Sequence, residues 1–486
     1  MATITHTYSN HRFQHPDRIA IHTQDHKISY DQWFKLICKT ANWLTSLQVS
    51  CKRIAILMHN GIPFLQLFAG ASAAGWIVAP LDVKWQDEEL QKRMKLCSPS
   101  IIITTRNMKD KLVSNSNVVF WEDCIEEIDQ SPIEYTAHLS GEHPFYMGFT
   151  SGSTGEPKAF VRAHASWAAS FECNTYDFQM KDNEHVVIPG ALIHSHFLYG
   201  AISTLFLGGT IYLLEKFTPY MTLSLLKEYP ITVIYLVPTM IEAILKEKDV
   251  IEKQVTIISS GAKWEPDSKQ RIRKMFPNLC MYEFYGASEL SFVTVLSNQE
   301  NIERPGSVGR PCYNVEIQIR KKDGTIASPY EAGKIFVRSN MVFMGYIETN
   351  CQRIQSIQDK DGWSTVHDMG YVDESGYLYI MGREKNMILY GGMNIFSEEI
   401  EAVLSSHPKV EDVAVIGLPD RYWGQVVAAV IKGKALKQEL RKFCKTMLAS
   451  YKVPRKWYFV DQIPLTTSGK IARSKVKEII EQGELS

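Results

Sequence analysis

The most informative stretch of the chain is Phe149-Thr150-Ser151-Gly152-Ser153-Thr154-Gly155-Glu156-Pro157-Lys158, which follows a short apolar segment at 144–147. Its hydroxyl-bearing and glycine residues let backbone N–H groups and hydroxyls surround an anion, and Lys158 adds a positive charge. It is not a Walker A loop, because Glu-Pro-Lys follows Gly155 where that pattern needs Lys-Ser/Thr. The stretch therefore predicts a phosphate-binding loop after a strand. Taken alone, it would also fit a flexible surface loop rich in serine and glycine.

On both sides of this loop, short apolar runs alternate with amphipathic stretches. Residues 53–58 are typical of a buried strand, 62–74 of a helix and 75–80 of the next strand. Strand–helix–strand units of this kind predict an α/β fold with a mostly parallel sheet covered by helices. Further apolar runs of strand length follow at 101–104, 186–188, 210–214, 233–236 and 255–258.

The pattern changes after about Val308. Residues 315–320 and 333–338 alternate polar and apolar side chains around a turn, which predicts an antiparallel subdomain over roughly 308–383. The last hundred residues predict a small α+β domain, in which Ser397 is the expected N-cap of a helix. A chain of 486 residues is too long for a single core. We therefore expect an N-terminal domain over 1–383, a hinge at 384–386 and a C-terminal domain over 387–486.

Composition and charge exclude several classes of protein. Lys plus Arg and Asp plus Glu are both 53, and this balance argues against a general nucleic-acid binder. With 45% hydrophobic and 22% charged residues, the chain is typical of a soluble globular protein. Its nine cysteines include no CxxC pair, which favours reduced thiols in a cytoplasmic protein. The most apolar segment, 66–82, is too short and interrupted for a membrane span, and the N-terminus lacks a secretory signal pattern.

Further motifs follow the glycine-rich loop in order. They are Tyr285-Gly286-Ala287-Ser288-Glu289, Thr365-Val366-His367-Asp368-Met369-Gly370-Tyr371, Gly382-Arg383-Glu384-Lys385, Tyr390-Gly391-Gly392-Met393-Asn394-Ile395 and Pro464-Leu465-Thr466-Thr467-Ser468-Gly469-Lys470. This ordered set resembles the acyl-adenylate-forming superfamily, which comprises acyl-CoA synthetases, adenylation domains of peptide synthetases and luciferases. The resemblance runs from near Asp17 to the C-terminus. It implies a large N-terminal lobe of packed α/β sheets with a β subdomain, and a small mobile C-terminal domain.

The resemblance also implies a reaction in two halves. A carboxylate attacks the α-phosphorus of ATP to give acyl-AMP and pyrophosphate, and a thiol then attacks the acyl carbonyl and releases AMP. Both steps displace charged groups, so positioning and charge neutralisation should carry most of the catalysis. The cofactors implied are ATP, Mg²⁺ and coenzyme A as co-substrate.

Most nucleotide contacts are implied by the first two motifs. Tyr285 would lie against the adenine and Gly286 would allow its close approach, while Ser288 keeps the hydroxyl of the family's commoner threonine. Glu289 would hold Mg²⁺ together with Thr154, since hard cations prefer oxygen ligands. The residues expected around the β- and γ-phosphates are Thr150, Ser151, Gly152, Ser153, Thr154, Gly155 and Lys158, and those beside the adenine and acyl group are Ser260, Gly261 and Ala262.

The later motifs imply the ribose contacts and the catalytic cation. Asp368 would accept hydrogen bonds from the ribose hydroxyls, although His367 stands where the family usually has glycine. Arg383 would contact the ribose or a phosphate. Lys470 would bridge the incoming carboxylate and the α-phosphate and offset the charge of the transition state. Lys385 matches the hinge, and the neutral Asn386 beside it replaces an acid often found there.

The acyl group is predicted from residues 189–198. This stretch has no acid, whereas domains for α-amino acids carry an Asp there for the ammonium group, so a fatty or other apolar acid is expected. His194 or His196 would gate the acyl pocket, and the sequence does not choose between them. Aryl acids and the acyl-chain length stay open.

The acceptor thiol is predicted from the segment that holds Gly391, Gly392 and Asn394, which resembles acyl-CoA ligases. Basic residues at 421, 442, 445, 452 and 455 could meet the phosphates of coenzyme A. The alternative is a stand-alone adenylation enzyme that loads a carrier protein in trans, because no carrier domain is expected after Lys470. A catalytically silent nucleotide- or acyl-binding protein is a third interpretation. A homo-oligomer is possible.

Overall fold

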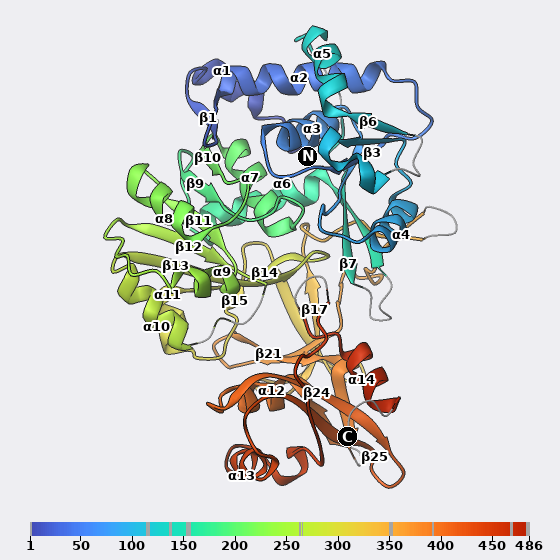
Figure 1. The fold of residues 1–486 in the computed structure, drawn as a ribbon, viewed down its shortest axis with the longest axis vertical. Helices are drawn as coiled ribbons and strands as arrows, with labels where there is room; N and C mark the ends of the chain where they lie inside the picture. The colour runs from blue at the N-terminus through green and yellow to red at the C-terminus, as the bar shows by residue number, and fades with distance from the viewer. Residues whose placement is uncertain are drawn as a thin grey trace. The chain divides into compact units, whose positions relative to one another are not determined.

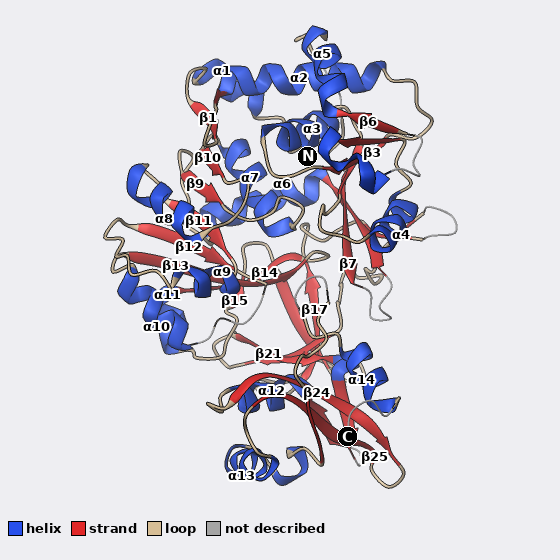
Figure 2. Cartoon of the chain, viewed as in Figure 1, coloured by secondary structure: helices blue, strands red, loops and turns tan. Residues whose placement is uncertain are grey.

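The computed structural model describes residues 2–112, 117–135, 139–151, 157–261, 264, 266–348, 353–390, 393–466 and 470–482. The chain divides into two compact units (Figures 1 and 2). The first comprises 1–150, 157–317 and 337–364, and the second comprises 151–156, 318–336 and 365–486. The domain limits expected from the sequence, with a joint at 384–386, stay a prediction.

The first unit contains a large mixed sheet with the strand order β15-β14-β13-β12-β11-β9-β10-β1-β2. Within this order, the adjacent strands β13, β12, β11, β9, β10 and β1 run parallel to one another. The β13–β14 hairpin adds an antiparallel edge. The strands are β1 (Ile19–His22), β2 (Lys27–Ser29), β9 (His185–Ile188), β10 (Thr210–Leu213), β11 (Val233–Leu236), β12 (Val255–Ser259), β13 (Leu279–Ala287), β14 (Ser291–Ser297) and β15 (Arg310–Pro311).

A second sheet of this unit has the order β19-β18-β8-β7-β4-β3-β5-β6. Its strands β6, β5, β3, β4 and β7 are parallel, and β18 pairs antiparallel with β8. The strands are β3 (Arg53–Leu57), β4 (Ile77–Pro80), β5 (Ile101–Thr104), β6 (Val118–Phe120), β7 (Pro144–Ser151), β8 (Pro157–Ala163), β18 (Gly345–Ile347) and β19 (Ile354–Gln355).

Helices cover these sheets. Helix α3 is apolar on every side and almost wholly buried, as expected for a helix enclosed by other elements. It packs closely on α2, because a Cβ at Gly70 would come within 2.6 Å of Thr40 Cβ. The helices are α1 (Tyr8–Gln14), α2 (Tyr30–Ser46), α3 (Ile62–Ala73), α4 (Asp87–Cys97), α5 (Trp121–Gln130), α6 (His164–Tyr176), α7 (Ser195–Leu207), α8 (Pro219–Glu228), α9 (Pro238–Ile244), α10 (Pro266–Met275) and α11 (Asn298–Glu303), with a 3₁₀ helix at Arg106–Leu112.

The second unit is built on two further sheets. One has the order β16-β17-β20-β21 and the other β23-β22-β25-β24, with β26 paired parallel to β25. Its strands β16 (Glu316–Arg320) and β17 (Gly333–Arg338) each have two residues in the first unit. The other elements are β20 (Asp368–Val372), β21 (Leu378–Arg383), β22 (Met387–Tyr390), β23 (Met393–Phe396), β24 (Val410–Asp420), β25 (Gly424–Gly433), β26 (Lys456–Phe459), α12 (Ser397–Ser405), α13 (Lys437–Met447) and α14 (Arg473–Glu481), with 3₁₀ helices at Glu384–Asn386 and Ser450–Lys452.

The α/β fold class is confirmed, and most of the strands predicted from apolar or alternating runs lie within two residues of their predicted limits. One helix start differs. Ser397 is the first residue of α12 and not its N-cap, which is Phe396. The Ser397 hydroxyl donates to the carbonyl oxygen of Asn386 at 2.7 Å, so this side chain ties the helix to the preceding segment instead of capping it.

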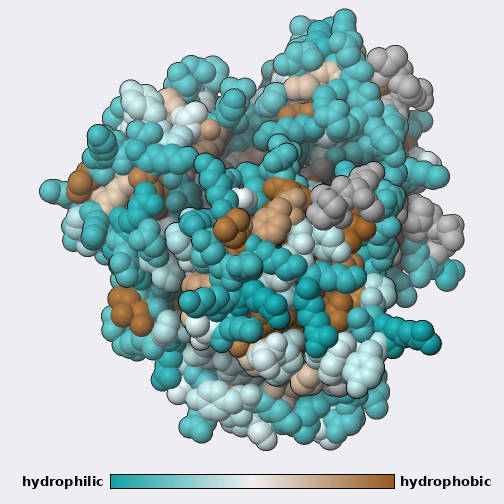
Figure 3. All heavy atoms as spheres, turned by 60° about the horizontal axis from the view of Figure 1, so that its bottom comes forward, coloured by the Kyte–Doolittle hydropathy of each residue, from teal (hydrophilic) through white to brown (hydrophobic). Residues whose placement is uncertain are grey.

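The surface in Figure 3 is mainly hydrophilic, with small hydrophobic groups separated by polar side chains. Among the described residues, no helix combines the length and apolar character that a membrane crossing needs.

His164, at the start of α6, makes stability depend on pH. It is fully buried, its ring stacks on Phe145, and burial lowers its pKa from 6.5 to about 3. Below pH 6.5 the unfolded chain binds a proton that the folded chain does not. The free energy of unfolding should therefore fall with decreasing pH, by up to about 1.4 kcal/mol per pH unit from this group.

Urea denaturation at pH 5.0, 6.0 and 7.5 measures this dependence. We expect His164→Phe to show a shallower slope than the wild type, and His15→Gln, which changes an exposed histidine, to keep the wild-type slope. Equal slopes in His164→Phe and the wild type would contradict the prediction.

Candidate active site

Several predicted site residues of the first unit lie at the carboxyl ends of parallel strands. Gly261 follows β12, His194 follows β9, and Tyr285 lies in the last part of β13. In open α/β sheets, ligands bind at this edge because the loops there converge. Ala262 lies outside the described residues.

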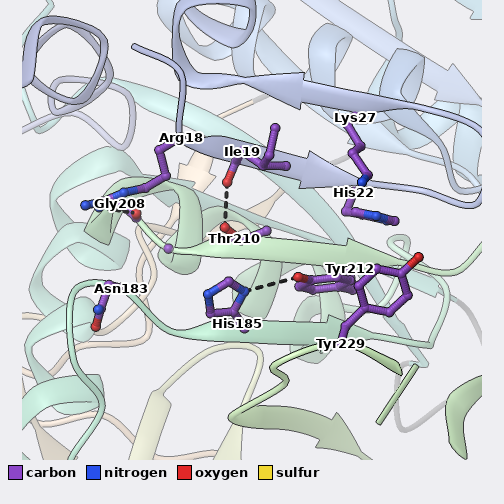
Figure 4. Close-up of a pocket in the computed structure, with 11 residues that line it drawn as sticks. Arg18, Ile19, His22, Lys27, Asn183, His185, Gly208, Thr210, Tyr212 and Tyr229 are labelled. Atoms are coloured by element: carbon purple, nitrogen blue, oxygen red, sulfur yellow. Dashed lines mark hydrogen bonds between the residues drawn. The ribbon is translucent and has the colours of Figure 1, made fainter. Parts of the chain in front are cut away.

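A cleft of about 320 Å³ runs across β1, β9 and β10, from the amino ends of β9 and β10 to His22 at the end of β1 (Figure 4), and none of the predicted site residues lines it. Its polar groups bond to one another: the Tyr212 hydroxyl lies 3.2 Å from His185 Nδ1, and Arg18 Nη1 donates to the Gly208 carbonyl at 3.0 Å. The cleft is therefore separate from the candidate site. Its lining is Arg18, Ile19, His22, Lys27, Asn183, His185, Gly208, Gly209, Thr210, Tyr212 and Tyr229.

The predicted phosphate loop joins two neighbouring strands, β7 and β8. Thr150 lies near the end of β7, and Lys158 is an exposed residue at the start of β8. The Lys158 ammonium lies 5.0 Å from the ring centroid of Tyr346. Gly152, Ser153, Thr154 and Gly155, and the side chain of Ser151, lie outside the described residues.

The motif 285–289 forms the end of β13 and the turn to β14. The register shifts between Tyr285 and Gly286, which is opposite Phe292. A Cβ at Gly286 would lie 2.1 Å from the carbonyl oxygen of Ser291, so only glycine fits this hairpin.

Glu289, the predicted metal ligand, is 8% exposed. The Tyr346 hydroxyl donates to its Oε1 at 2.6 Å, and its backbone carbonyl accepts from the Phe343 N–H at 2.8 Å. A carboxylate has two oxygens, so this bond leaves a hard oxygen donor of the kind that Mg²⁺ prefers.

No cluster of three or more His, Cys, Asp or Glu side chains placed to hold a metal ion occurs within the described part of the chain. A magnesium site of the predicted kind does not require such a cluster, because Mg²⁺ is usually held by one or two carboxylates and substrate phosphates. Glu289 therefore fits the predicted ion.

A buried arginine, which sequence reasoning missed, supports the Glu289 turn. Arg162 in β8 is 2% exposed and donates to the Ser288 carbonyl at 2.8 and 3.1 Å. Its Nη1 also donates to Met341 O at 2.8 Å and Ser166 Oγ at 3.2 Å. Burial lowers the pKa of Arg162 to about 10, so it stays charged at neutral pH. An arginine inside an apolar strand is the signal that could have found it.

In the second unit, β20 and β21 bring Asp368 and Arg383 together. They are paired residues of the two strands, and Arg383 Nε donates to Asp368 Oδ1 at 3.1 Å. Asp368 is 7% exposed. His367 has φ +64°, a left-handed backbone conformation that explains why glycine is common at this position. Its Nδ1 lies 3.0 Å from Glu384 Oε2.

Lys385 lies in the 3₁₀ helix Glu384–Asn386. Asn386 Nδ2 donates to Glu398 Oε1 at 2.7 Å. An acid at position 386 would face the carboxylate of Glu398, so the neutral amide is the compatible residue here. The exposed Lys470 donates its backbone N–H to Thr466 Oγ1 at 3.1 Å. Gly391, Gly392 and the side chain of Asn394 lie outside the described residues.

The two candidate histidines have different surroundings. His194 is exposed and precedes α7 as its N-cap. His196 Nε2 lies 3.1 Å from the Leu236 carbonyl, and its ring packs on Tyr235 and Phe284 with centroids 5.2 and 5.7 Å apart. Burial lowers the pKa of His196 to about 4, so the ring is neutral at physiological pH.

Residues 9–347 match the AMP-binding enzyme family, and residues 399–470 match the AMP-binding enzyme C-terminal domain. The chain is 49% identical to an uncharacterized acyl-CoA ligase, YhfT, of Bacillus subtilis (strain 168), over 99% of both chains. It is 27% identical to a 2-succinylbenzoate–CoA ligase of Bacillus cereus, over 99% of this chain and 100% of the relative.

Among solved structures, the o-succinylbenzoate CoA synthetase (MenE) from Bacillus subtilis, in complex with the acyl-adenylate OSB-AMP, is similar with a TM-score of 0.88. The match has 25% identity and covers 97% of each chain. A structure of the same enzyme in complex with ATP and a magnesium ion has a TM-score of 0.87.

The fold and the ordered motifs define the class of adenylate-forming enzymes. The chain belongs to the AMP-binding enzyme family. The predicted resemblance and the predicted class, an AMP-forming acid–thiol ligase, are confirmed, and so is the use of ATP, Mg²⁺ and coenzyme A by this class. The role of each site residue stays a prediction.

Gly286→Ala tests the hairpin that carries Tyr285 and Glu289. Because the new Cβ would overlap a backbone carbonyl, we expect a loss of about 1–3 kcal/mol in the free energy of unfolding and weaker ATP binding. Urea denaturation and calorimetry measure these changes. Gly61→Ala is the control, since its Cβ would lie 3.4 Å from Pro63 Cδ, an ordinary contact. Wild-type ATP affinity in Gly286→Ala would rule out close approach of the nucleotide at this glycine.

Proposed function

We propose that the protein is an ATP-dependent carboxylic acid–CoA ligase for an apolar acid. It converts the acid and ATP to acyl-AMP and pyrophosphate, and then transfers the acyl group to coenzyme A with release of AMP. The observation that carries the proposal is the group formed by Lys158, Tyr346 and Glu289, in which a cation and a carboxylate share one neutral partner. Such a group suits a nucleotide whose phosphates need positive charge and a metal ion at once.

In this proposal the described residues bind and orient ATP before reaction. Lys158 attracts the terminal phosphates, and Glu289 holds the Mg²⁺ ion that offsets their charge. Tyr285 lies against the adenine. Asp368 accepts from the ribose hydroxyls while its other oxygen bonds to Arg383, which fixes the carboxylate. Lys470 places a positive charge between the attacking carboxylate and the α-phosphate. Lys385 is the hinge at which the C-terminal domain rotates between the two half-reactions.

The proposed acid is apolar because of the surroundings of His196. A neutral ring packed between Tyr235 and Phe284 offers an aromatic wall without a charge for an ammonium group. His196, and not the exposed His194, is therefore the proposed gate of the acyl pocket. The 2-succinylbenzoate–CoA ligases among the relatives favour an aryl acid, and a fatty acid is the other candidate.

Lys470→Ala tests the adenylation step. We expect acyl-AMP formation to fall by at least about 100-fold, because a cation that stabilises charge only in the transition state is removed. Transfer of a supplied acyl-AMP to coenzyme A should be nearly unchanged. The protein is incubated with ATP, Mg²⁺, coenzyme A and a pool of fatty, aryl and dicarboxylic acids. Mass spectrometry of the products then measures acyl-AMP formation and identifies the acid.

Lys477→Ala, which changes another lysine of the second unit, is the matched control. An equal loss in both half-reactions of Lys470→Ala would contradict its role. If the wild type formed acyl-AMP but no acyl-CoA, this result would contradict coenzyme A as the acceptor and indicate a carrier protein instead.

Coenzyme A is the proposed acceptor because of an aromatic cluster in the second unit. Tyr390 and Trp423 stack with centroids 4.5 Å apart, and the Arg455 guanidinium lies 5.0 Å from the Trp423 ring. Tyr422 packs edge-on against Trp423 and is 82% exposed. The exposed ring of Tyr422, beside this cluster and its arginine, suits an adenine that carries phosphates.

Tyr422→Ala should raise the KM for coenzyme A by about 5- to 50-fold, from the loss of base stacking, with an unchanged KM for ATP. Steady-state kinetics at saturating acid measure both values. Tyr330→Ala removes another exposed tyrosine of the same unit and should leave both KM values unchanged. A wild-type KM for coenzyme A in Tyr422→Ala would exclude this cluster from the acceptor site.

A further inference from the structure

One tyrosine, Tyr346, contacts two side chains for which the sequence predicted different roles. The Tyr346 hydroxyl donates to Glu289 Oε1 at 2.6 Å, and the Lys158 ammonium lies 5.0 Å from the centroid of the same ring. Glu289 is the proposed metal ligand, and Lys158 is the proposed phosphate ligand. No sequence motif pointed to Tyr346.

Strand pairing places Tyr346 at this position. Strand β18 runs antiparallel to β8, with Tyr346 opposite Phe160. Lys158 is two residues before Phe160 on β8 and therefore lies on the same face, within diagonal reach of the tyrosine ring.

Two further contacts hold the tyrosine in place. Gly345 has φ +150°, and a Cβ there would lie 2.1 Å from the Gln355 carbonyl, so glycine allows β18 to pass between β8 and β19. The ring of Phe343 packs against that of Tyr346 at 5.0 Å, and the Phe343 N–H donates to the Glu289 carbonyl. The segment 343–346 therefore contacts both the backbone and the side chain of Glu289.

We propose that Tyr346 is a positioning residue that prepares Glu289 for Mg²⁺ and Lys158 for the phosphates of ATP. This inference rests on the proposed function. Donation of the hydroxyl hydrogen to the carboxylate fixes the position of one of its oxygens. The second oxygen then remains for the metal ion.

The ring acts differently on Lys158. A cation over an aromatic face is held without losing its charge, whereas a carboxylate partner would neutralise it. Tyr346 is thus a neutral partner shared by a cation and an anion, with Lys158 over its ring and Glu289 at its hydroxyl. Both charges are kept for the nucleotide and its metal ion.

Two variants separate the hydroxyl from the ring. Tyr346→Phe removes the bond to Glu289 and keeps the ring under Lys158. Tyr346→Leu removes both contacts. Glu289→Gln is the reference for loss of the metal ligand, and Tyr220→Phe, at a 72% exposed tyrosine, is the matched control.

The measurement is calorimetric binding of ATP to the full chain over a range of Mg²⁺ concentrations, without acid, so that no turnover occurs. We expect Tyr346→Phe to need about tenfold more Mg²⁺ for half-maximal tightening of ATP binding, and to keep wild-type affinity at saturating Mg²⁺. Tyr346→Leu should show the same shift and also bind ATP severalfold more weakly at saturating Mg²⁺. Tyr220→Phe should match the wild type.

The outcomes distinguish this inference from the proposed function. A wild-type Mg²⁺ dependence in Tyr346→Phe, together with a shift in Glu289→Gln, would overturn the role of Tyr346 alone. No shift in either variant would also remove Glu289 from the metal site. Ligase activity is judged separately, by the acyl-CoA product. Tyr346→Phe changes a single oxygen, so thermal unfolding at the wild-type temperature would show that a shift does not come from misfolding.

Discussion

The buried charge of Arg162 is the constraint on which the candidate nucleotide site of the first unit depends. A guanidinium that is 2% exposed must have its donors satisfied, because an unpaired buried charge costs several kcal/mol. Its partners are carbonyls of Ser288 and Met341 and the hydroxyl of Ser166. The strand after the phosphate loop is thereby bonded to the turn that carries Glu289 and to the segment that leads to Tyr346. These three pieces cannot shift independently without leaving the charge unpaired.

Sequence patterns predicted the α/β fold and most of the buried parallel strands well, because a buried parallel strand is a short apolar run whatever its neighbours are. The predicted start of α12 was wrong. Serine is a residue type that favours the N-cap, but the Ser397 hydroxyl donates to the carbonyl oxygen of Asn386 instead of capping the helix. Arg162 and Tyr346 could not be assigned partners. Their contacts join residues 126 and 57 positions apart, and such pairs depend on strand order, which periodicity does not contain.

Two departures from the family pattern follow from local geometry. His367 occupies a left-handed backbone position where glycine carries no strain, and the contact of its ring with Glu384 offsets part of that cost. Asn386 replaces an acid beside the proposed hinge, and its amide donates to Glu398. In both cases the substituted side chain bonds to a nearby carboxylate. The sequence motif is therefore altered while the backbone it requires is kept.

Oppositely charged side chains are arranged differently in the two units. Asp368 and Arg383 bond directly, which holds the carboxylate still for the contact with the ribose hydroxyls that we propose. Lys158 and Glu289 instead share a neutral partner, because Lys158 lies over the ring of Tyr346 and Glu289 accepts from its hydroxyl. In the proposed function, a direct ion pair between Lys158 and Glu289 would have to break before either charge could act on the phosphates or the metal ion. The energy of that pair would be subtracted from nucleotide binding. Keeping the charges apart makes their attraction available to the substrate.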